Sequence, residues 1–306
     1  MSGQTKDLFL TLQPPERNAI RAKLLHCLAA ESLPYVRNKI GDAVAEIARQ
    51  YTEEGTASKS LDWTGKITDT KMVPGEPWQE LLGALFTASQ SNDPGQRESA
   101  FRIFATTPGI IEKQHEDTVI AAFTKGFKDD DVSVYNNPTP LESRVLMTFK
   151  VRIAAMEAFA SFFRSINKKS QPKYYALIPE ILNILPPIKE AGDAEQLTKA
   201  LISLIELAEV APKMFKPLFN NLVMFSVSVI QDKDLGDQAR QNALELMATF
   251  ADYNPQMCRK DPAYTNDMVT QCLSLMTDVG IDDDDAEEWN ASEDVGKIIS
   301  LNSRQY

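Results

Sequence analysis

Residues that could perform covalent chemistry are sparse in this chain of 306 residues. The two histidines, His26 and His115, lie far apart in the sequence, and His26 is next to Cys27 on an apolar segment, which is typical of core packing. The segment 63–66 (Trp-Thr-Gly-Lys) lacks the leading glycine and the spacing of a phosphate-binding loop. Because no nucleophile, base and orienting group can be assembled, we expect no catalytic residues and a protein that is not an enzyme.

The cysteines predict neither a metal site nor a disulfide framework. There are three of them, an odd number at wide spacing with no C-x-x-C pair: Cys27, Cys258 and Cys272. Such residues are typical of the reduced thiols of a cytosolic or nuclear protein. We therefore expect no cofactor and no bound metal.

The net charge limits the partners that the chain can bind. A formal charge of −11 argues against a nucleic-acid interface, which needs a basic face, and against binding to anionic membranes. The N-terminus has no apolar stretch of signal-peptide length, and no segment approaches the ~20 apolar residues that span a bilayer. We expect a soluble intracellular protein with no direct nucleic-acid contact and no membrane insertion.

Most of the net negative charge comes from one segment, residues 282–294, which we call the acidic segment. It holds eight acids and no lysine or arginine, and without these acids the net charge would be −3. Its central residues are Asp282, Asp283, Asp284, Asp285, Glu287, Glu288 and Trp289. Charge blocks are usually solvated loops. Because this block directly follows a predicted helix and contains an aromatic residue without a local apolar partner, we expect it to contact a basic partner.

The positioning elements are predicted by apolar residues that recur at helical spacing in segments closed by turn residues. One hairpin of two such helices cannot cover its own apolar face, so neighbouring hairpins must stack. The fold class is therefore all-α, a superhelical solenoid of antiparallel hairpins of the HEAT or armadillo type. We expect about five and a half repeats within residues 1–281, followed by the acidic segment and a tail at 282–306. The hairpins are expected near 16–50, 77–106, 115–166, 173–210 and 214–252, with a single first helix at 262–278.

The second helices share a register that is marked by an arginine in four hairpins: Arg37, Arg97, Arg152 and Arg240. Thr198 takes that place in the remaining hairpin, and the successive spacings are 60, 55, 46 and 42 residues. The last two agree with the ~40–47 residues of HEAT repeats, and polar insertions at 53–76 and 129–144 account for the excess in the first two. The arginines could face an acidic partner, but we expect them to bond to carbonyls or acids of their own and adjacent hairpins.

Several segments resemble one family of helical solenoids. They are 204–216 (LIELAEVAPKMFK), 233–235 (KDL), 254–258 (NPQMC), 281–289 (IDDDDAEEW) and 97–103 (RESAFRI). On these residues the sequence is similar to the importin-β (karyopherin-β) nuclear transport receptors, in particular to the fungal importin beta-three branch. The resemblance covers most of 16–294 and departs at both insertions and at 295–306. It implies an N-terminal fragment of a receptor that carries cargo through nuclear pores.

The resemblance also implies the partners: the Ran GTPase in its GTP form, FG-repeat nucleoporins and basic cargo proteins, bound by a monomer that is cytoplasmic and nuclear. For Ran, polar residues off the apolar stripe of the first two inner helices are the candidates: Asn38, Asp42, Glu46, Glu98 and Arg102. For an FG phenylalanine, the candidates lie between the outer helices 173–189 and 214–231: Tyr175, Ile178, Phe215 and Phe219. Core packing is the alternative for these four, although Tyr175 and Phe215 fall off the main apolar face.

A second hypothesis remains open at this point. A HEAT-repeat adaptor or scaffold subunit of another complex, such as a phosphatase or a translation-related assembly, would show the same periodicity.

Overall fold

The computed structural model describes residues 9, 11–52, 78–111, 115–129 and 141–278. Over these residues the chain is helical and contains no strand, so the all-α class is confirmed. None of the helices in these ranges is both long enough and apolar enough to cross a membrane.

The helices form two rows. The first row holds α2 (Pro14–Ala30), α4 (Gln79–Ser89), α6 (Glu116–Phe127), η4 (Gln171–Leu177), α8 (Ile178–Leu182), α9 (Leu185–Glu190), η5 (Pro212–Leu218), α11 (Phe219–Ile230) and α14 (Tyr264–Thr277). The second row holds α3 (Pro34–Thr52), α5 (Pro94–Thr106), α7 (Leu141–Ser165), α10 (Ala194–Val210) and α12 (Gly236–Tyr253). Short connecting helices are η2 (Pro108–Ile110), η6 (Lys233–Leu235) and α13 (Pro255–Cys258).

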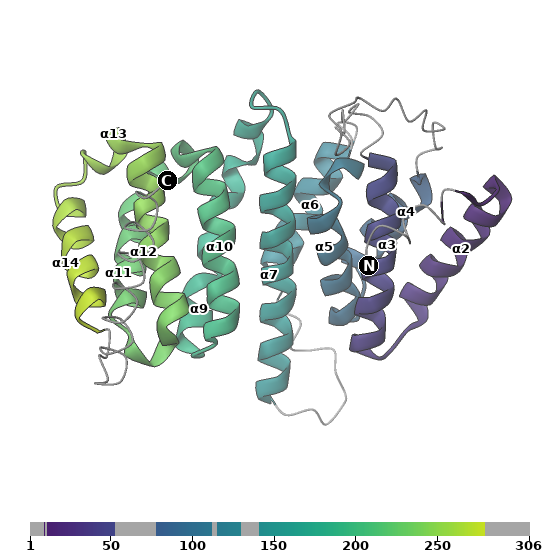
Figure 1. Cartoon of the computed structure of the whole chain (residues 1–306), viewed down its shortest axis with the longest axis horizontal. Helices are drawn as coiled ribbons and strands as arrows, with labels where there is room; N and C mark the ends of the chain where they lie inside the picture. Colours follow the sequence, from purple (N-terminus) through teal and green to yellow (C-terminus); the bar gives the residue numbers. More distant parts are fainter. Residues whose placement is uncertain (1–8, 10, 53–77, 112–114, 130–140, 279–306) are drawn as a thin grey trace, which may run out of the picture.

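Each helix packs against its hairpin partner and against its equivalents in the neighbouring hairpins. In the second row, α3 packs on α5, α5 on α7, α7 on α10 and α10 on α12. In the first row, α2 packs on α4, α4 on α6, α6 on α8 and α11 on α14. Figure 1 shows the hairpins side by side along the long axis of the molecule, from α2 at one end to α14 at the other. This is the stacking of a solenoid.

Turn residues define where the second helices begin. The carboxylate of Asp93 accepts a hydrogen bond from the Gly95 N–H at 2.9 Å, and Pro94 follows as the first residue of α5. Asp193 caps α10 in the same way, by accepting from the Gln196 N–H at 3.1 Å. Both caps satisfy backbone N–H donors that have no partner inside the helix. Proline at the first position of α5 costs no hydrogen bond, because an N–H at that position would have no partner in the helix. Successive turns lie next to one another along one edge of the solenoid, as the contacts of Arg37 with Asp93 and of Lys189 with Asp232 show.

One predicted helix is interrupted. The range 173–189 was expected to be one outer helix, but the structure has η4, α8 and α9 there. η4 runs directly into α8, and a turn at 183–184 separates α8 from α9. The prolines at 179, 186 and 187 explain the breaks, because proline lacks the N–H that an uninterrupted helix needs and its ring clashes with the preceding turn.

The core is continuous from one hairpin to the next and is rich in phenylalanine. Phe123 of α6 lies between hairpins, with ring centroids 6.1 Å from Phe101 of α5 and 5.4 Å from Phe159 of α7. Gly126 permits this approach of α6, because a Cβ atom there would lie 2.6 Å from a ring carbon of Phe101 and 2.8 Å from the Cβ of Ala155. Burial of such rings is a large apolar contribution to the stability of the stack.

The boundaries of the second insertion were wrong. The range 129–144 was expected to be a polar loop, but Asp129 is buried and α7 already begins at Leu141. The interior of that range, and the whole of the insertion 53–76, lie outside the described residues.

Candidate partner-binding surface

The repeat arginines lie at the turn edge and join adjacent hairpins. Arg37 donates from Nε and Nη2 to the Glu31 carbonyl, at 2.9 and 2.7 Å, and from Nη2 to the Asp93 carboxylate of the next hairpin at 2.9 Å. Its side chain is only 5% exposed, so it is not available to bind another protein.

Arg97 makes the most enclosed of these contacts. Its Nε and Nη2 atoms donate to both carboxylate oxygens of Asp129 at 2.6 and 2.9 Å, while Nη1 donates to the carbonyls of Ser91 and Asn92. Both side chains of the ion pair are 3% exposed. The Asp129 carbonyl accepts in turn from Nε of Arg152 at 2.9 Å, so this aspartate connects α5 to α7.

The last two hairpins continue the row. Arg240 donates from Nε to the Ile230 carbonyl at 2.8 Å and from Nη2 to the Asp278 carboxylate beyond α14. In the hairpin where Thr198 replaces the arginine, Lys189 reaches Asp232 of the next turn at 3.0 Å. Lys189 was not predicted from the sequence, because it lies in the first helix of its hairpin and outside the arginine register.

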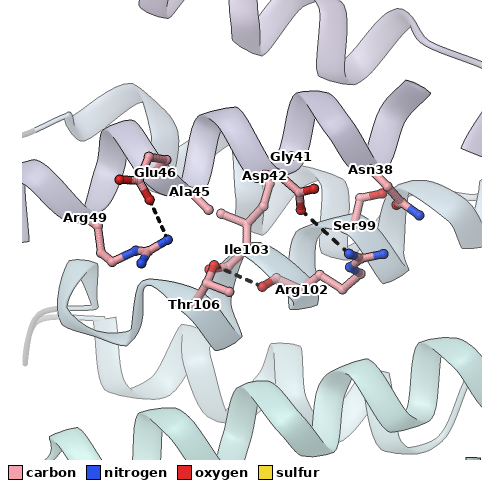
Figure 2. Close-up of a pocket in the computed structure, with 10 residues that line it drawn as sticks. All are labelled: Asn38, Gly41, Asp42, Ala45, Glu46, Arg49, Ser99, Arg102, Ile103 and Thr106. Carbon is pink, nitrogen blue, oxygen red and sulfur yellow. Dashed lines mark hydrogen bonds and ion pairs between the residues drawn. The ribbon is translucent and has the colours of Figure 1, made fainter. Parts of the chain in front are cut away.

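A polar hollow opens on the second-helix row between α3 and α5, with a volume of about 270 Å³. Figure 2 shows Asp42 and Arg102 directed toward each other across it, beside Ile103. The lining residues are Asn38, Gly41, Asp42, Ala45, Glu46, Arg49, Ser99, Arg102, Ile103 and Thr106. Gly41, Ala45 and Ile103 form its apolar floor.

The hollow holds charges of both signs in weak pairs. Arg102 Nη2 lies 3.7 Å from Asp42 Oδ1, and these side chains are 41% and 54% exposed. Lys39 Nζ is 3.4 Å from Asp42 Oδ2, and Arg49 Nη2 is 2.8 Å from Glu46 Oε2. Solvent-exposed pairs of this kind contribute only ~0–1 kcal/mol each. The carboxylates and guanidinium groups can therefore exchange their present partners for those of a docking protein at little cost.

The structure brings four of the five Ran candidates into this hollow: Asn38, Asp42, Glu46 and Arg102. Glu98 does not line it. Glu98 is half-buried one turn earlier on α5, where its charge acts on Glu157 of α7. Arg49, Ser99 and Thr106 line the hollow and were not identified from the sequence, since their side chains face it only once the angle between the two helices is known.

The charged surface continues from α5 to α7 and α10. Burial raises the pKa of the Glu157 carboxyl, and the positive charges of Lys199 and Arg102 partly oppose that shift. Arg164 of α7 and Glu206 of α10 approach to 3.6 Å on the same row of helices. The second-helix row therefore presents both signs of charge across several hairpins.

The FG candidates lie mainly in the core. Phe215 and Ile178 are 0% and 1% exposed, so the expectation that Phe215 falls off the apolar face was wrong. The reason is that η5 turns its ring inward onto Phe250, with centroids 5.4 Å apart. Phe219 is 5% exposed and borders a surface groove, and Tyr175 is half-buried. The four side chains do not form one open slot.

The remaining predictions concern the acidic segment and metal binding. The acidic segment, Asp282 to Trp289 and onward, lies outside the described residues. Among the residues that are described, no group of three or more His, Cys, Asp or Glu side chains could hold a metal ion.

Comparison with known proteins agrees with the sequence resemblance. Residues 59–137 and 144–225 match the family described as "IPO5-like, TPR repeats", and 232–297 match the family described as "Importin repeat". Importin subunit beta-3 of Saccharomyces cerevisiae is 34% identical over 275 residues, which are 90% of this chain and 22% of that protein.

Solved structures show the same similarity. The structures of Kap121p bound to RanGTP and of Kap121p bound to Nup53p superpose with TM-scores of 0.67 and 0.66, at 34% and 33% identity, over 92% of this chain and 23% of theirs. The chain therefore spans between a fifth and a quarter of the length of these relatives. The match over more than half of the chain, the identity to the yeast protein and the shared solenoid lead to one conclusion. The chain belongs to the importin-β (karyopherin-β) family of nuclear transport receptors, in its importin-5-like branch.

Proposed function

We propose that this chain forms an N-terminal part of a nuclear import receptor, a binding scaffold and not an enzyme, and that the hollow between α3 and α5 contacts Ran in its GTP form. The observation that carries the proposal is the pairing of Asp42 with Arg102 across two neighbouring second helices, with both side chains about half exposed. Kap121p, which this chain resembles over 92% of its residues, has been solved bound to RanGTP.

The other proposed partners follow from the same family. FG nucleoporins would bind the first-helix row, and basic cargo proteins would meet the acidic segment, in a protein that moves between cytoplasm and nucleus. Kap121p has also been solved bound to Nup53p. Family membership favours this function over a scaffold subunit of a phosphatase or translation complex.

A pull-down with Ran loaded with GTP or GDP tests the proposal. We expect the chain to retain the GTP form of Ran. The double charge reversal D42K/R102E should weaken retention, because each new side chain then faces a residue of Ran that has the same charge. The matched control is D117K/K23E, which exchanges the same two signs on the first helices α6 and α2. Equal retention by both variants would place Ran elsewhere, and retention of neither nucleotide form by the parent would count against a Ran contact on this chain.

A further inference from the structure

A second surface groove lies at the opposite edge of the solenoid from the turns. It opens between η5, the start of α11 and α13, and its volume is about 660 Å³. Phe219 and Met257, which are largely buried, form an apolar floor, while Asn220, Asn254 and Gln256 supply amide groups. The groove can therefore hold an apolar side chain and bond to the polar groups beside it.

The rim of the groove is basic. Lys213, Lys216 and Lys260 are all exposed, and none of their ammonium groups forms an ion pair with any part of the chain that the structure describes. Lys189, by contrast, is bound to Asp232 at 3.0 Å. Asp261 also lines the groove, where its carboxylate accepts from the Ala263 N–H at 3.1 Å. Three positive charges around an apolar floor are complementary to an acidic peptide that carries one aromatic side chain.

The acidic segment has this composition and is tethered within reach. It carries eight acids, no basic residue and Trp289. The helix α14 has 14 residues, about 21 Å at 1.5 Å per residue, and begins two residues after Pro262 of the groove. From Asp278 the chain needs eleven residues to reach Trp289, and eleven extended residues span up to ~36 Å. The chain can therefore return alongside α14 and place Glu287, Glu288 and Trp289 at the groove.

We propose that this groove is a binding site for an acidic peptide anchored by an aromatic side chain, and that its occupant is the acidic segment of the same chain. Trp289 lies on the floor of Phe219 and Met257, and Glu287 and Glu288 pair with the lysines of the rim. The tether makes this an intramolecular contact with a high effective concentration, so weak ion pairs suffice. A basic protein that binds the acids competes with the groove for them.

Zero-length carbodiimide cross-linking of the whole chain tests the placement, since it joins lysine to carboxylate only where the two are in contact. We expect cross-links from Lys213, Lys216 or Lys260 to Glu287 or Glu288 in the peptide map. An equal mixture of isotope-labelled and unlabelled chains shows whether the two ends belong to one molecule. Cross-links between different chains, or from these acids to lysines outside the groove, would overturn the proposal.

Binding of the segment in trans tests the chemistry. The probe is a fluorescent peptide of residues 281–294, added to the whole chain with its own segment neutralised (D282N, D283N, D284N, D285N, E287Q, E288Q and W289A). We expect the further change K213E/K216E/K260E to weaken binding by at least about tenfold. The matched reversal K23E/K168E/K169E, at exposed lysines elsewhere, should leave the affinity unchanged.

The peptide itself supplies the second arm. Replacing its Trp289 by Ala should also weaken binding about tenfold, because the apolar floor then loses its ligand. Added salt should weaken the parent interaction, since exposed charges are screened. The proposal fails if the groove reversal and the control reversal bind alike, if the tryptophan is dispensable, or if the peptide does not bind. The circular dichroism of each variant confirms that the fold is retained.

Discussion

The substitution Asp129→Ala should destabilise the solenoid more than any exposed charge deletion. It removes both carboxylate acceptors of Arg97, at 2.6 and 2.9 Å, from a site where both side chains are 3% exposed. The guanidinium group then loses two short hydrogen bonds and the carboxylate charge of Asp129, while its bonds to the carbonyls of Ser91 and Asn92 remain. Removal of one partner from a buried ion pair costs about 3–5 kcal/mol.

Urea unfolding followed by far-ultraviolet circular dichroism measures the effect. With a slope of about 3 kcal/mol/M, the loss corresponds to a midpoint about 1–1.7 M lower. The exposed pair of Glu195 and Lys199 on α10 is the control, because its carboxylate is 74% exposed and E195Q should cost less than about 0.5 kcal/mol.

A double-mutant cycle separates the ion pair from simple loss of packing. The variant R97M/D129A removes both charges, so its cost should be smaller than the sum of the two single costs. If D129A costs less than about 1 kcal/mol, or if the two single costs add, then the buried pair does not join the hairpins as we argue.

Three further substitutions have defined expectations. G126A should destabilise by about 1–3 kcal/mol because its Cβ would meet Phe101, whereas G83A, with no atom within 4 Å of the added Cβ, should be neutral or stabilising in the same urea titration. F250A should cost about 3–5 kcal/mol by thermal or urea unfolding, because two phenylalanine rings of η5 and α11 pack on it at 5.4 and 5.2 Å. Burial raises the pKa of Glu157 above 4.5, so its folded form holds the proton to higher pH than the unfolded chain, and stability falls as pH rises from about 4.5 through the folded pKa. The variant E157Q should therefore be more stable than the parent at pH 7 and lose that advantage below pH 4.5, and a parent that is equally or more stable at pH 7 would contradict the burial argument.

The solenoid could be predicted from the sequence because every hairpin repeats the same local signals. Apolar spacing, capping residues such as Asp93 and Asp193, and the arginine register all act within one hairpin. They therefore appear in any short window of sequence. The breaks around α8 and α9 also have a signal in the sequence, which is the three prolines at 179, 186 and 187. The apolar spacing of the same residues favours one continuous helix, so the two signals conflict there.

The contacts between hairpins were harder to foresee. Asp129 lies in a polar stretch that is typical of a loop, and its role depends on Arg97, 32 residues earlier. Phe215 shows the same limit, because helical phase assumes a continuous α-helix while η5 has a 3₁₀ geometry that rotates the ring into the core. Four of the five Ran candidates line one hollow between α3 and α5, because helical phase within a regular α-helix can be read from the sequence. That Ran binds there stays a prediction.

The row of polar bonds at the turn edge has a mechanical consequence. Arg37 with Asp93, Arg97 with Asp129, Lys189 with Asp232 and Arg240 with Asp278 each fix the distance between two adjacent hairpins at the same edge of the stack. Ionic hydrogen bonds are short and directional, whereas packed apolar helices can slide by small steps. The stack should therefore be stiff in tension along that edge and more compliant along the other. A change in superhelical curvature would then be a bending motion in which the distances between hairpins stay nearly constant along the arginine row. The hairpins would move apart or together most at the opposite edge, which carries α13.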